Sequence, residues 1–285
     1  MDRESGMSEQ WRLFIDVALC ENCGNCQLAA KDEYVGNDFP GYSAPHPLRG
    51  AETFRIERFI RGEGSQIDVA YVPRMCNHCA DAPCIKAAPD VISRREDGIV
   101  LIDPKRAHGR SDLVAACPYG AIGWNAELQL PQNWIFDAHL FDLGWKQPRC
   151  EQVCPTGAIV SAKLDAEDFE RAKREQGLEE WNPGLNTRPS VVYKNLQRAK
   201  SCAIFGSVVM ETAGLQDCAS GARVRLKRDG AVFGEQVSDD FGDFKFDGLE
   251  PDSGPYALTV EHESGRAEVE IGKLASSVAL GDIRL

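Results

Sequence analysis

At 285 residues the chain is long enough for two domains, and its 43% of hydrophobic residues is sufficient for ordinary protein cores. The formal net charge of −12 argues against nucleic acid, or an anionic membrane, as the main partner. No stretch reaches the roughly 18 to 20 apolar residues that span a bilayer, and the first residues contain neither an apolar signal core nor a twin-arginine pair. The expected localisation is therefore cytoplasmic, unless an exported partner carries the chain.

Residues 1–162 are rich in loops, with short strand-like runs at 13–15 and 99–102 that lead into or out of groups of cysteines. Alternating segments at 54–59 and 67–71 flank a Gly-rich turn and predict a β-hairpin. The stretch 37–50 is rich in Pro, Gly and aromatic residues. It predicts either an irregular covering loop or a loop that docks a partner.

Residues 163–200 are expected to connect two regions, with a short polar helix over 165–180 that Asp165 or Asp168 caps and Gly177 interrupts. From about residue 201, alternating runs separated by turns predict seven strands, at 204–210, 222–227, 231–237, 243–246, 256–261, 267–271 and 278–285. Seven short strands at this spacing favour a small β-sandwich or barrel. No ligand-binding group of residues stands out there, so a packing or docking module is expected.

Eleven cysteines without an export signal indicate metal ligands before disulfides. Six of them form two tight triplets, Cys20-x2-Cys23-x2-Cys26 and Cys76-x2-Cys79-x4-Cys84. Two others, Cys117 and Cys154, each precede a proline. Bacterial ferredoxins use triplets of this kind together with a remote Cys-Pro, because three cysteines on one loop cannot reach the fourth iron of a cubane cluster. The two triplets and the two Cys-Pro cysteines therefore give eight expected cluster ligands.

A zinc site fits these spacings poorly, because structural zinc sites usually combine two short loops that each supply two ligands. His78 stands between two of the expected ligands and is predicted to be a loop residue, since thiolate is the usual donor to such clusters. Cys150, Cys202 and Cys218 are left over and are predicted to be free thiols.

These cysteine groups resemble the four-group iron–sulfur subunits that partner molybdopterin oxidoreductases of the dimethyl sulfoxide reductase family. Within that family, the chain is similar over nearly its whole length to small subunits of the pyrogallol–phloroglucinol transhydroxylase and phenolic-ring hydroxylase type. The segments that carry the resemblance are 15–20, 95–104, 117–120, 138–140, 148–150, 193–196 and 241–247. The resemblance implies an α+β fold, with a ferredoxin-like 4Fe-4S domain (1–162), a connector (163–200) and a small all-β sandwich or barrel module of transthyretin or Cna-B type (201–285).

The resemblance also implies the ligands of two [4Fe-4S] clusters. Cluster 1 would be held by Cys20, Cys23, Cys26 and Cys154, and cluster 2 by Cys76, Cys79, Cys84 and Cys117. Members with four clusters have further cysteines at positions where this chain has Ala30, Ala88, Ala107, Arg110 and Leu113, and either Ile135 with Ala138 or Trp134 with Asp137. A third cluster held by Asp137 and Cys150 would need unusual ligands, so two clusters are expected.

The sequence has no nucleotide-binding glycine loop, no Ser/His/Asp order and no open metal site. The resemblance therefore implies that catalysis belongs to a large partner subunit with a bis-molybdopterin guanine dinucleotide molybdenum cofactor, and that this chain transfers electrons for a hydroxylase or transhydroxylase of phenolic compounds. Two alternatives stay open. One is an electron-transfer subunit of another molybdenum enzyme, such as a reductase of sulfur or arsenic oxyanions, and the other is a mainly structural subunit. The β-module favours the hydroxylase or transhydroxylase of phenolic compounds over the oxyanion reductase, because simple four-cluster subunits generally lack it. The partner interface is expected on the N-terminal domain and residues 37–71.

Overall fold

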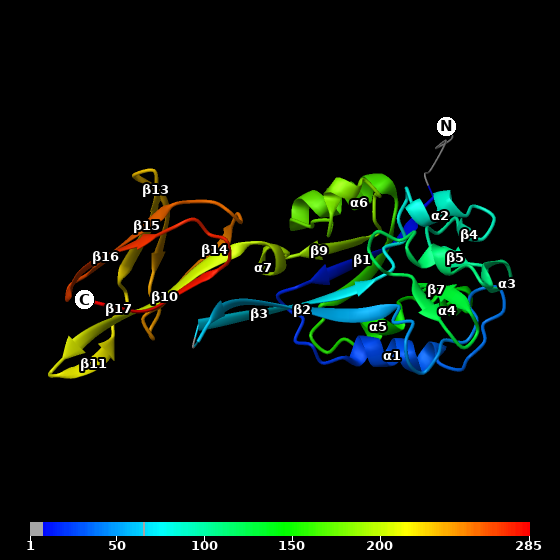
Figure 1. Cartoon of the computed structure of the whole chain (residues 1–285), viewed down its shortest axis with the longest axis horizontal. Coiled ribbons are helices and arrows are strands. Elements are labelled where there is room, and N and C mark those ends of the chain that lie inside the picture. The colour runs from blue at the N-terminus through cyan, green and yellow to red at the C-terminus, as the bar shows by residue number, and fades with distance from the viewer. Residues whose placement is uncertain (1–7, 65) are drawn as a thin grey trace, which may run out of the picture. The chain divides into compact units, whose positions relative to one another are not determined.

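The structure is a computed structural model, and it describes residues 8–64 and 66–285. The chain forms two compact units (Figure 1). The cysteine-rich unit comprises Met1–Glu57 and Tyr71–Leu196, and the β-rich unit comprises Arg58–Ala70 and Gln197–Leu285. The sequence predicts three consecutive segments, whereas in the structure a segment from the first third of the chain joins the C-terminal strands.

A three-stranded sheet organises the cysteine-rich unit. Its central strand, β1 (Gln10–Asp16), pairs antiparallel with β8 (Ile159–Leu164) and parallel with β9 (Val191–Lys194). Helix α6 (Ala166–Gln176) packs on this sheet through a small apolar cluster that includes Phe169 and Val192. The helix lies inside the predicted range 165–180. Asp165 caps its start by accepting a hydrogen bond from the backbone N–H of Asp168 (2.8 Å), and Gly177, with a φ of 63°, ends it.

Short elements carry the cysteine loops between these strands. The helices are α1 (Asn25–Tyr34), α2 (Pro83–Ala87), α3 (Pro104–Ala107), α4 (Ala138–Asp142) and α5 (Arg149–Gln152), with 3-10 turns at Ser111–Val114 and Pro183–Leu185. Two small hairpins pair β4 (Ile92–Arg94) with β5 (Val100–Ile102), and β6 (Gly123–Asn125) with β7 (Leu130–Gln132). The strand predicted at 99–102 is confirmed as β5.

The predicted hairpin at 54–71 is also confirmed, and both of its strands are longer than expected. They are β2 (Phe54–Glu63) and β3 (Gln66–Met75). The base of the hairpin belongs to the cysteine-rich unit, and residues 58–70 belong to the β-rich unit. Alternation of side chains identified the hairpin, but it contains no information about which unit the tip would join.

Two four-stranded sheets make up most of the β-rich unit. In the first, β10 pairs with β11, β14 and β17, and in the second the order is β13-β12-β15-β16. The strands are β10 (Cys202–Thr212), β11 (Leu215–Cys218), β12 (Arg223–Arg228), β13 (Ala231–Val237), β14 (Asp243–Leu249), β15 (Tyr256–His262), β16 (Gly265–Ile271) and β17 (Val278–Arg284). A short helix, α7 (Gln197–Lys200), precedes them. All seven predicted strands are present, and β11 is an eighth. It escaped prediction because all four of its residues are exposed and show no alternation.

Side chains from both sheets contribute to one apolar core. Its members include Ile204, Val208, Val224, Leu226, Phe244, Phe246, Leu258 and Val260. On β10, Gly206 lies directly beneath the ring of Phe244, so closely that a Cβ at this position would overlap the ring. The glycine is therefore required by close approach of a core side chain.

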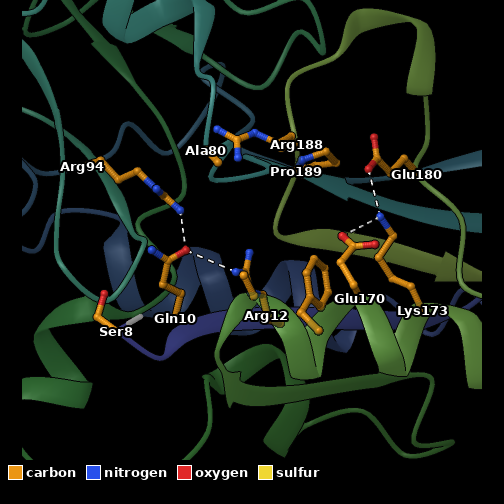
Figure 2. A pocket seen from close by; sticks show the side chains of 12 residues that line it. Ser8, Gln10, Arg12, Ala80, Arg94, Glu170, Lys173, Glu180, Arg188 and Pro189 are labelled. Carbon is orange, nitrogen blue, oxygen red and sulfur yellow. Dashed lines mark hydrogen bonds and ion pairs between the residues drawn. The ribbon is translucent and has the colours of Figure 1, made fainter. Parts of the chain in front are cut away.

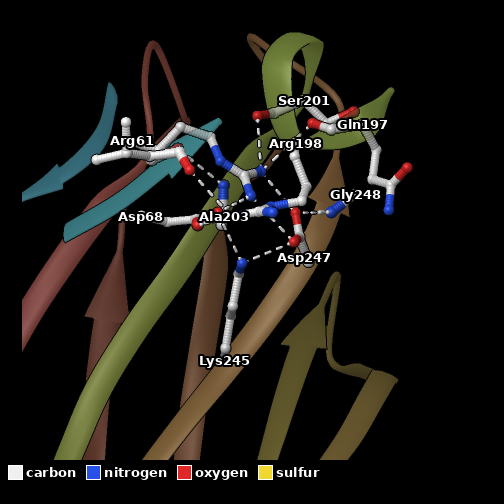
Figure 3. Close-up of polar contacts among 11 residues, drawn as sticks. Arg61, Asp68, Gln197, Arg198, Ser201, Ala203, Lys245, Asp247 and Gly248 are labelled. Atoms are coloured by element: carbon white, nitrogen blue, oxygen red, sulfur yellow. Dashed lines mark hydrogen bonds and ion pairs between the residues drawn. The ribbon is translucent and has the colours of Figure 1, made fainter. Parts of the chain in front are cut away.

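A polar cluster joins the hairpin tip to the strands within the β-rich unit (Figure 3). The guanidinium of Arg61, whose side chain is only 7% exposed, donates hydrogen bonds to the carboxylates of Asp68 and Asp247. Asp68 also accepts hydrogen bonds from Arg198 (2.6 Å) and Lys245 (3.0 Å). Three cations and two carboxylates therefore share one largely buried site.

None of the helices in residues 8–64 and 66–285 is both long enough and apolar enough to cross a membrane.

Candidate iron–sulfur cluster sites

The first cysteine set lies where β1 leads into α1. Cys20 and Cys23 are on the connecting loop, and Cys26 is in the first turn of the helix. Gly24, with a φ of 76°, provides the left-handed turn at the helix start. Cys154 lies two residues after the end of α5, which packs against α1. The two short helices therefore bring a residue from far along the chain to the loop that carries the triplet.

The thiols of this first set are close enough to affect each other's ionisation. Burial is the main cause that raises the pKa of Cys26 to about 12, and the neighbouring Cys20, Cys23 and Cys154 contribute in the same direction. The pKa of Cys20 is raised as well, first by burial and then by the neighbouring Cys154 and Cys23. Cys23 is exposed, so this set lies at the surface of the unit.

The second set is more deeply buried. Cys76 and Cys79 follow strand β3, Cys84 is in α2, and Cys117 follows the 3-10 turn at Ser111–Val114. All four belong to one packed cluster, which also contains Tyr119. Burial, then repulsion from Cys117 and Cys84, raises the pKa of Cys79 to about 12, although Thr187 opposes the shift by a hydrogen bond. The pKa of Cys84 is raised to about 11, again by burial and then by Cys117.

The donor set in each group fits a [4Fe-4S] cluster. All eleven cysteines are free, and eight of them form two groups of four: Cys154 lies with the first triplet and Cys117 with the second. Because burial and mutual repulsion both oppose ionisation, the thiolates that iron requires would be stabilised there only by a bound cation or cluster. Within the described residues, no three His, Cys, Asp or Glu side chains converge on the position of a single metal ion.

Apolar packing occupies most of the positions where the resemblance to four-cluster subunits implies further cysteines beside the second set. Ala88, Ala107 and Leu113 are all buried in one core cluster, and Cys84 and Cys117 pack against its edge. The remaining position, Arg110, forms an ion pair with Asp112 on the surface. The three buried positions therefore form ordinary core.

The corresponding positions beside the first set are also filled. Ala30, Trp134, Ile135 and Ala138 are buried. The ring of Trp134 stacks on Phe136 at a centroid distance of 4.7 Å. These side chains pack where extra ligands would stand.

Asp137 and Cys150, the two unusual ligands considered for a third cluster, are both buried. The hydroxyl of Tyr34 donates to one oxygen of the Asp137 carboxylate, and the backbone N–H of Arg149 donates to the other at 2.7 Å. Burial raises the pKa of Asp137, and burial followed by the nearby Asp137 and Cys26 raises the pKa of the Cys150 thiol. Both carboxylate oxygens therefore already have protein partners.

His78 is a buried loop residue beside the second set. Its Nδ1 accepts a hydrogen bond from the backbone N–H of Val100 (3.0 Å) and lies 3.9 Å from the sulfur of Cys76. Because Nδ1 is an acceptor, the ring proton is on Nε2. Burial, followed by the charge of Arg94, lowers the pKa of His78 to about 3, so the ring is neutral.

A cover over the second set was missed by sequence reasoning. The segment 187–190 lies against it: the backbone N–H groups of Ala80 and Asp81 donate to the carbonyls of Arg188 and Thr187. The hydroxyls of Tyr119 and Thr187 are 2.6 Å apart. More than a hundred residues separate this segment from the triplet that it covers, and no local pattern in it indicates such a contact.

Residues 67–163 match the 4Fe-4S dicluster domain family. The pyrogallol hydroxytransferase small subunit of Pelobacter acidigallici is 37% identical over 97% of this chain and 100% of its own length. The chain belongs to the family of this small subunit.

More distant relatives match shorter parts of the chain. A subunit of the tetrathionate reductase of Salmonella typhimurium is 29% identical over 71% of this chain and 79% of its own. The arsenate respiratory reductase iron–sulfur subunit of Shewanella sp. is 34% identical over 48% of this chain and 53% of its own. The similarity thus extends over 97% of the chain for the first relative and over shorter parts of it for the other two.

Proposed function

We propose that this chain is the iron–sulfur electron-transfer subunit of a molybdopterin-dependent hydroxylase or transhydroxylase that acts on phenolic aromatic compounds. The observation that carries the proposal is the grouping of eight thiols into two sets of four. The chain that contains them is 37% identical to a pyrogallol hydroxytransferase small subunit over 97% of its length. Relatives named for tetrathionate and arsenate match 71% and 48% of the chain, which favours the phenolic class over oxyanion reduction.

In this proposal, Cys20, Cys23, Cys26 and Cys154 hold one [4Fe-4S] cluster, and Cys76, Cys79, Cys84 and Cys117 hold a second. When bound, each cluster supplies one-electron oxidation and reduction. The protein excludes water more fully from the second set, whose Cys76 and Cys79 are buried, than from the first, whose Cys23 is exposed. Because burial and solvent exposure tune cluster potentials, we expect the two clusters to differ in potential.

Catalysis would take place on a large partner subunit that carries a bis-molybdopterin guanine dinucleotide molybdenum cofactor. The finer fold that accompanies this function is a ferredoxin-like domain within the cysteine-rich unit and a β-sandwich or barrel of transthyretin or Cna-B type within the β-rich unit. Support for the first is that each triplet ends in a short helix, and support for the second is the core shared by both sheets. A cytoplasmic location is part of the proposal, because a reducing compartment suits thiolate cluster ligands.

Anaerobic iron, acid-labile sulfide and molybdenum analysis of the purified complex tests the proposal. We expect about eight irons and eight sulfides per chain, with molybdenum on the partner. About twelve irons would mean that a third cluster is present. Zinc in place of iron, without molybdenum, would overturn the proposal.

Single substitutions test the ligand assignment. Cys117→Ala should remove about half of the iron, because one cluster loses its fourth ligand. Cys218→Ala is the matched control, since Cys218 is an exposed free thiol on β11 of the β-rich unit. Equal iron content in both variants would exclude Cys117 as a ligand.

A further inference from the structure

A cavity of about 410 Å³ in the cysteine-rich unit is lined by an excess of cations (Figure 2). Four of the lining side chains are cationic and two are carboxylates: Arg12, Arg94, Lys173 and Arg188, with Glu170 and Glu180. The chain as a whole has a formal net charge of −12. A local excess of positive charge on an acidic protein indicates a site that attracts anions.

Two of the four cations already have carboxylate partners. The Lys173 ammonium lies 3.2 Å from a carboxylate oxygen of Glu170 and 3.2 Å from one of Glu180. Arg188 pairs with Asp81 at 2.5 Å. The protein itself therefore neutralises these two cations. With Asp81 included, four cations face three carboxylates, and Arg12 and Arg94 are the two cations without a carboxylate partner.

Arg12 and Arg94 form no ion pair among the described residues. Arg12 is only 5% exposed, and its guanidinium donates to two neutral acceptors, Ser190 Oγ at 3.0 Å and Gln10 Oε1 at 3.2 Å. Its buried Nε has no hydrogen-bond partner. Arg94 donates to the same Gln10 oxygen at 2.6 Å and to the carbonyl of Gly98 at 3.3 Å. One neutral amide oxygen therefore lies between two guanidinium groups, as Figure 2 shows.

This arrangement is electrostatically unfavourable without a further anion. Burial, followed by the charge of Arg94, lowers the pKa of Arg12 to about 10, and Glu170 opposes the shift only in part. The ring of Phe169 covers the Arg12 guanidinium at 4.2 Å from Cζ. Each guanidinium has five N–H donors and uses two of them in the hydrogen bonds above, so several donors are left for a ligand.

We propose that this cavity binds a small dissolved oxyanion, with a carboxylate or phosphate group held between Arg12 and Arg94. Planar guanidinium groups match the paired oxygens of such anions, and hydrogen bonds between opposite charges are stronger than neutral ones. The cavity is also lined by Ala80, the residue that follows Cys79, so the bound anion would lie near the second cysteine set.

Isothermal titration of the full-length chain, in its purified complex, with inorganic phosphate and separately with acetate tests this proposal. Ionic strength is held constant with chloride, so that general screening does not change. We expect saturable binding of at least one anion to one site. Arg94→Gln should weaken that binding more than about tenfold, because it removes a charge and the charge-assisted hydrogen bonds that the guanidinium would donate to the anion.

Arg106→Gln is the matched control, because Arg106 is an exposed arginine of the same unit and does not line the cavity. Its affinity should equal that of the unchanged protein. Arg12→Gln should weaken binding as well, but Arg12 is buried and its loss could unfold the unit, so the half-buried Arg94 carries the test. Absence of saturable binding, or equal affinity in the Arg94 and Arg106 variants, would overturn the proposal.

Discussion

Replacing Asp68 with asparagine tests how the hairpin tip is held in the β-rich unit. The substitution keeps the shape of the side chain and removes its charge. Its carboxylate is 15% exposed and accepts hydrogen bonds from Arg61, Arg198 and Lys245. In the variant, Asp247 remains as the one carboxylate of the cluster.

The expected loss of stability follows from these contacts. Removing one partner of a buried ion pair typically costs about 3–5 kcal/mol. Here the cost is reduced, because Arg198 and Lys245 are 24% and 34% exposed and Asp247 still pairs with Arg61 and Lys245. We therefore expect the free energy of unfolding of the β-rich unit to fall by about 2–3 kcal/mol.

Hydrogen exchange followed by mass spectrometry measures this loss locally, in peptides that cover β10 and β14. A loss of 2–3 kcal/mol corresponds to exchange faster by roughly 30- to 150-fold where those strands open together. Asp229→Asn is the control, because Asp229 is 84% exposed in a turn of the same unit. The reasoning fails if the Asp68 variant exchanges at the unchanged rate, or if the control exchanges just as fast.

The same substitution has a defined pH dependence. Burial by itself would raise the pKa of Asp68, but hydrogen bonds from Arg198, Arg61 and Lys245 outweigh it and lower that pKa well below its usual range. A carboxylate with a depressed folded-state pKa contributes stability above its unfolded pKa of about 3.9 and loses it as the pH falls further. The difference between the two proteins should be constant from pH 6 to 8, and should shrink below about pH 4.

Two further substitutions test close packing and a buried hydrogen bond. Gly206→Ala should destabilise the β-rich unit by about 1–3 kcal/mol, because the new methyl group overlaps the ring of Phe244. Gly272→Ala is the control and should leave stability unchanged, because nothing lies near the added carbon. Equal chemical denaturation midpoints for the two variants would contradict this prediction. Tyr34→Phe should lower the free energy of unfolding by about 1–3 kcal/mol, because it removes a hydrogen-bond donor from the buried Asp137 carboxylate. The loss should be smaller when Asp137 is also replaced by asparagine. An equal loss with Asp137 and with Asn at position 137 would refute the coupling between the two side chains.

Local patterns predicted those parts of the fold that local physics determines. Alternation located the strands from β12 onward, and the pair of a capping aspartate with a glycine located helix α6. The Cys-Pro motif predicted that Cys117 and Cys154 lie near the triplets, and the structure places each of them beside one triplet. That these cysteines are cluster ligands stays a prediction. In each case the signal lies within a few residues of the feature that it predicts.

Features that depend on distant segments could not be predicted in this way. The cover over the second cysteine set comes from Thr187 and Arg188, and neither residue stands in a recognisable motif. Arg12 on β1 and Arg94 on β4 come from different sheets of one unit and line one cavity. Isolated arginines in the sequence show no sign of it. Such sites emerge only when the tertiary arrangement is known.

The interleaving of the two units limits how this protein can be divided. The chain passes from one unit to the other after Glu57, Ala70 and Leu196. A fragment that starts near residue 201 would lack Arg61 and Asp68, so Lys245 and Asp247 would lose their partners from the hairpin. The β-rich unit is therefore not one contiguous segment, and recombination at a single breakpoint could not transfer it intact. A chimera that exchanges it between relatives must exchange residues 58–70 together with 197–285.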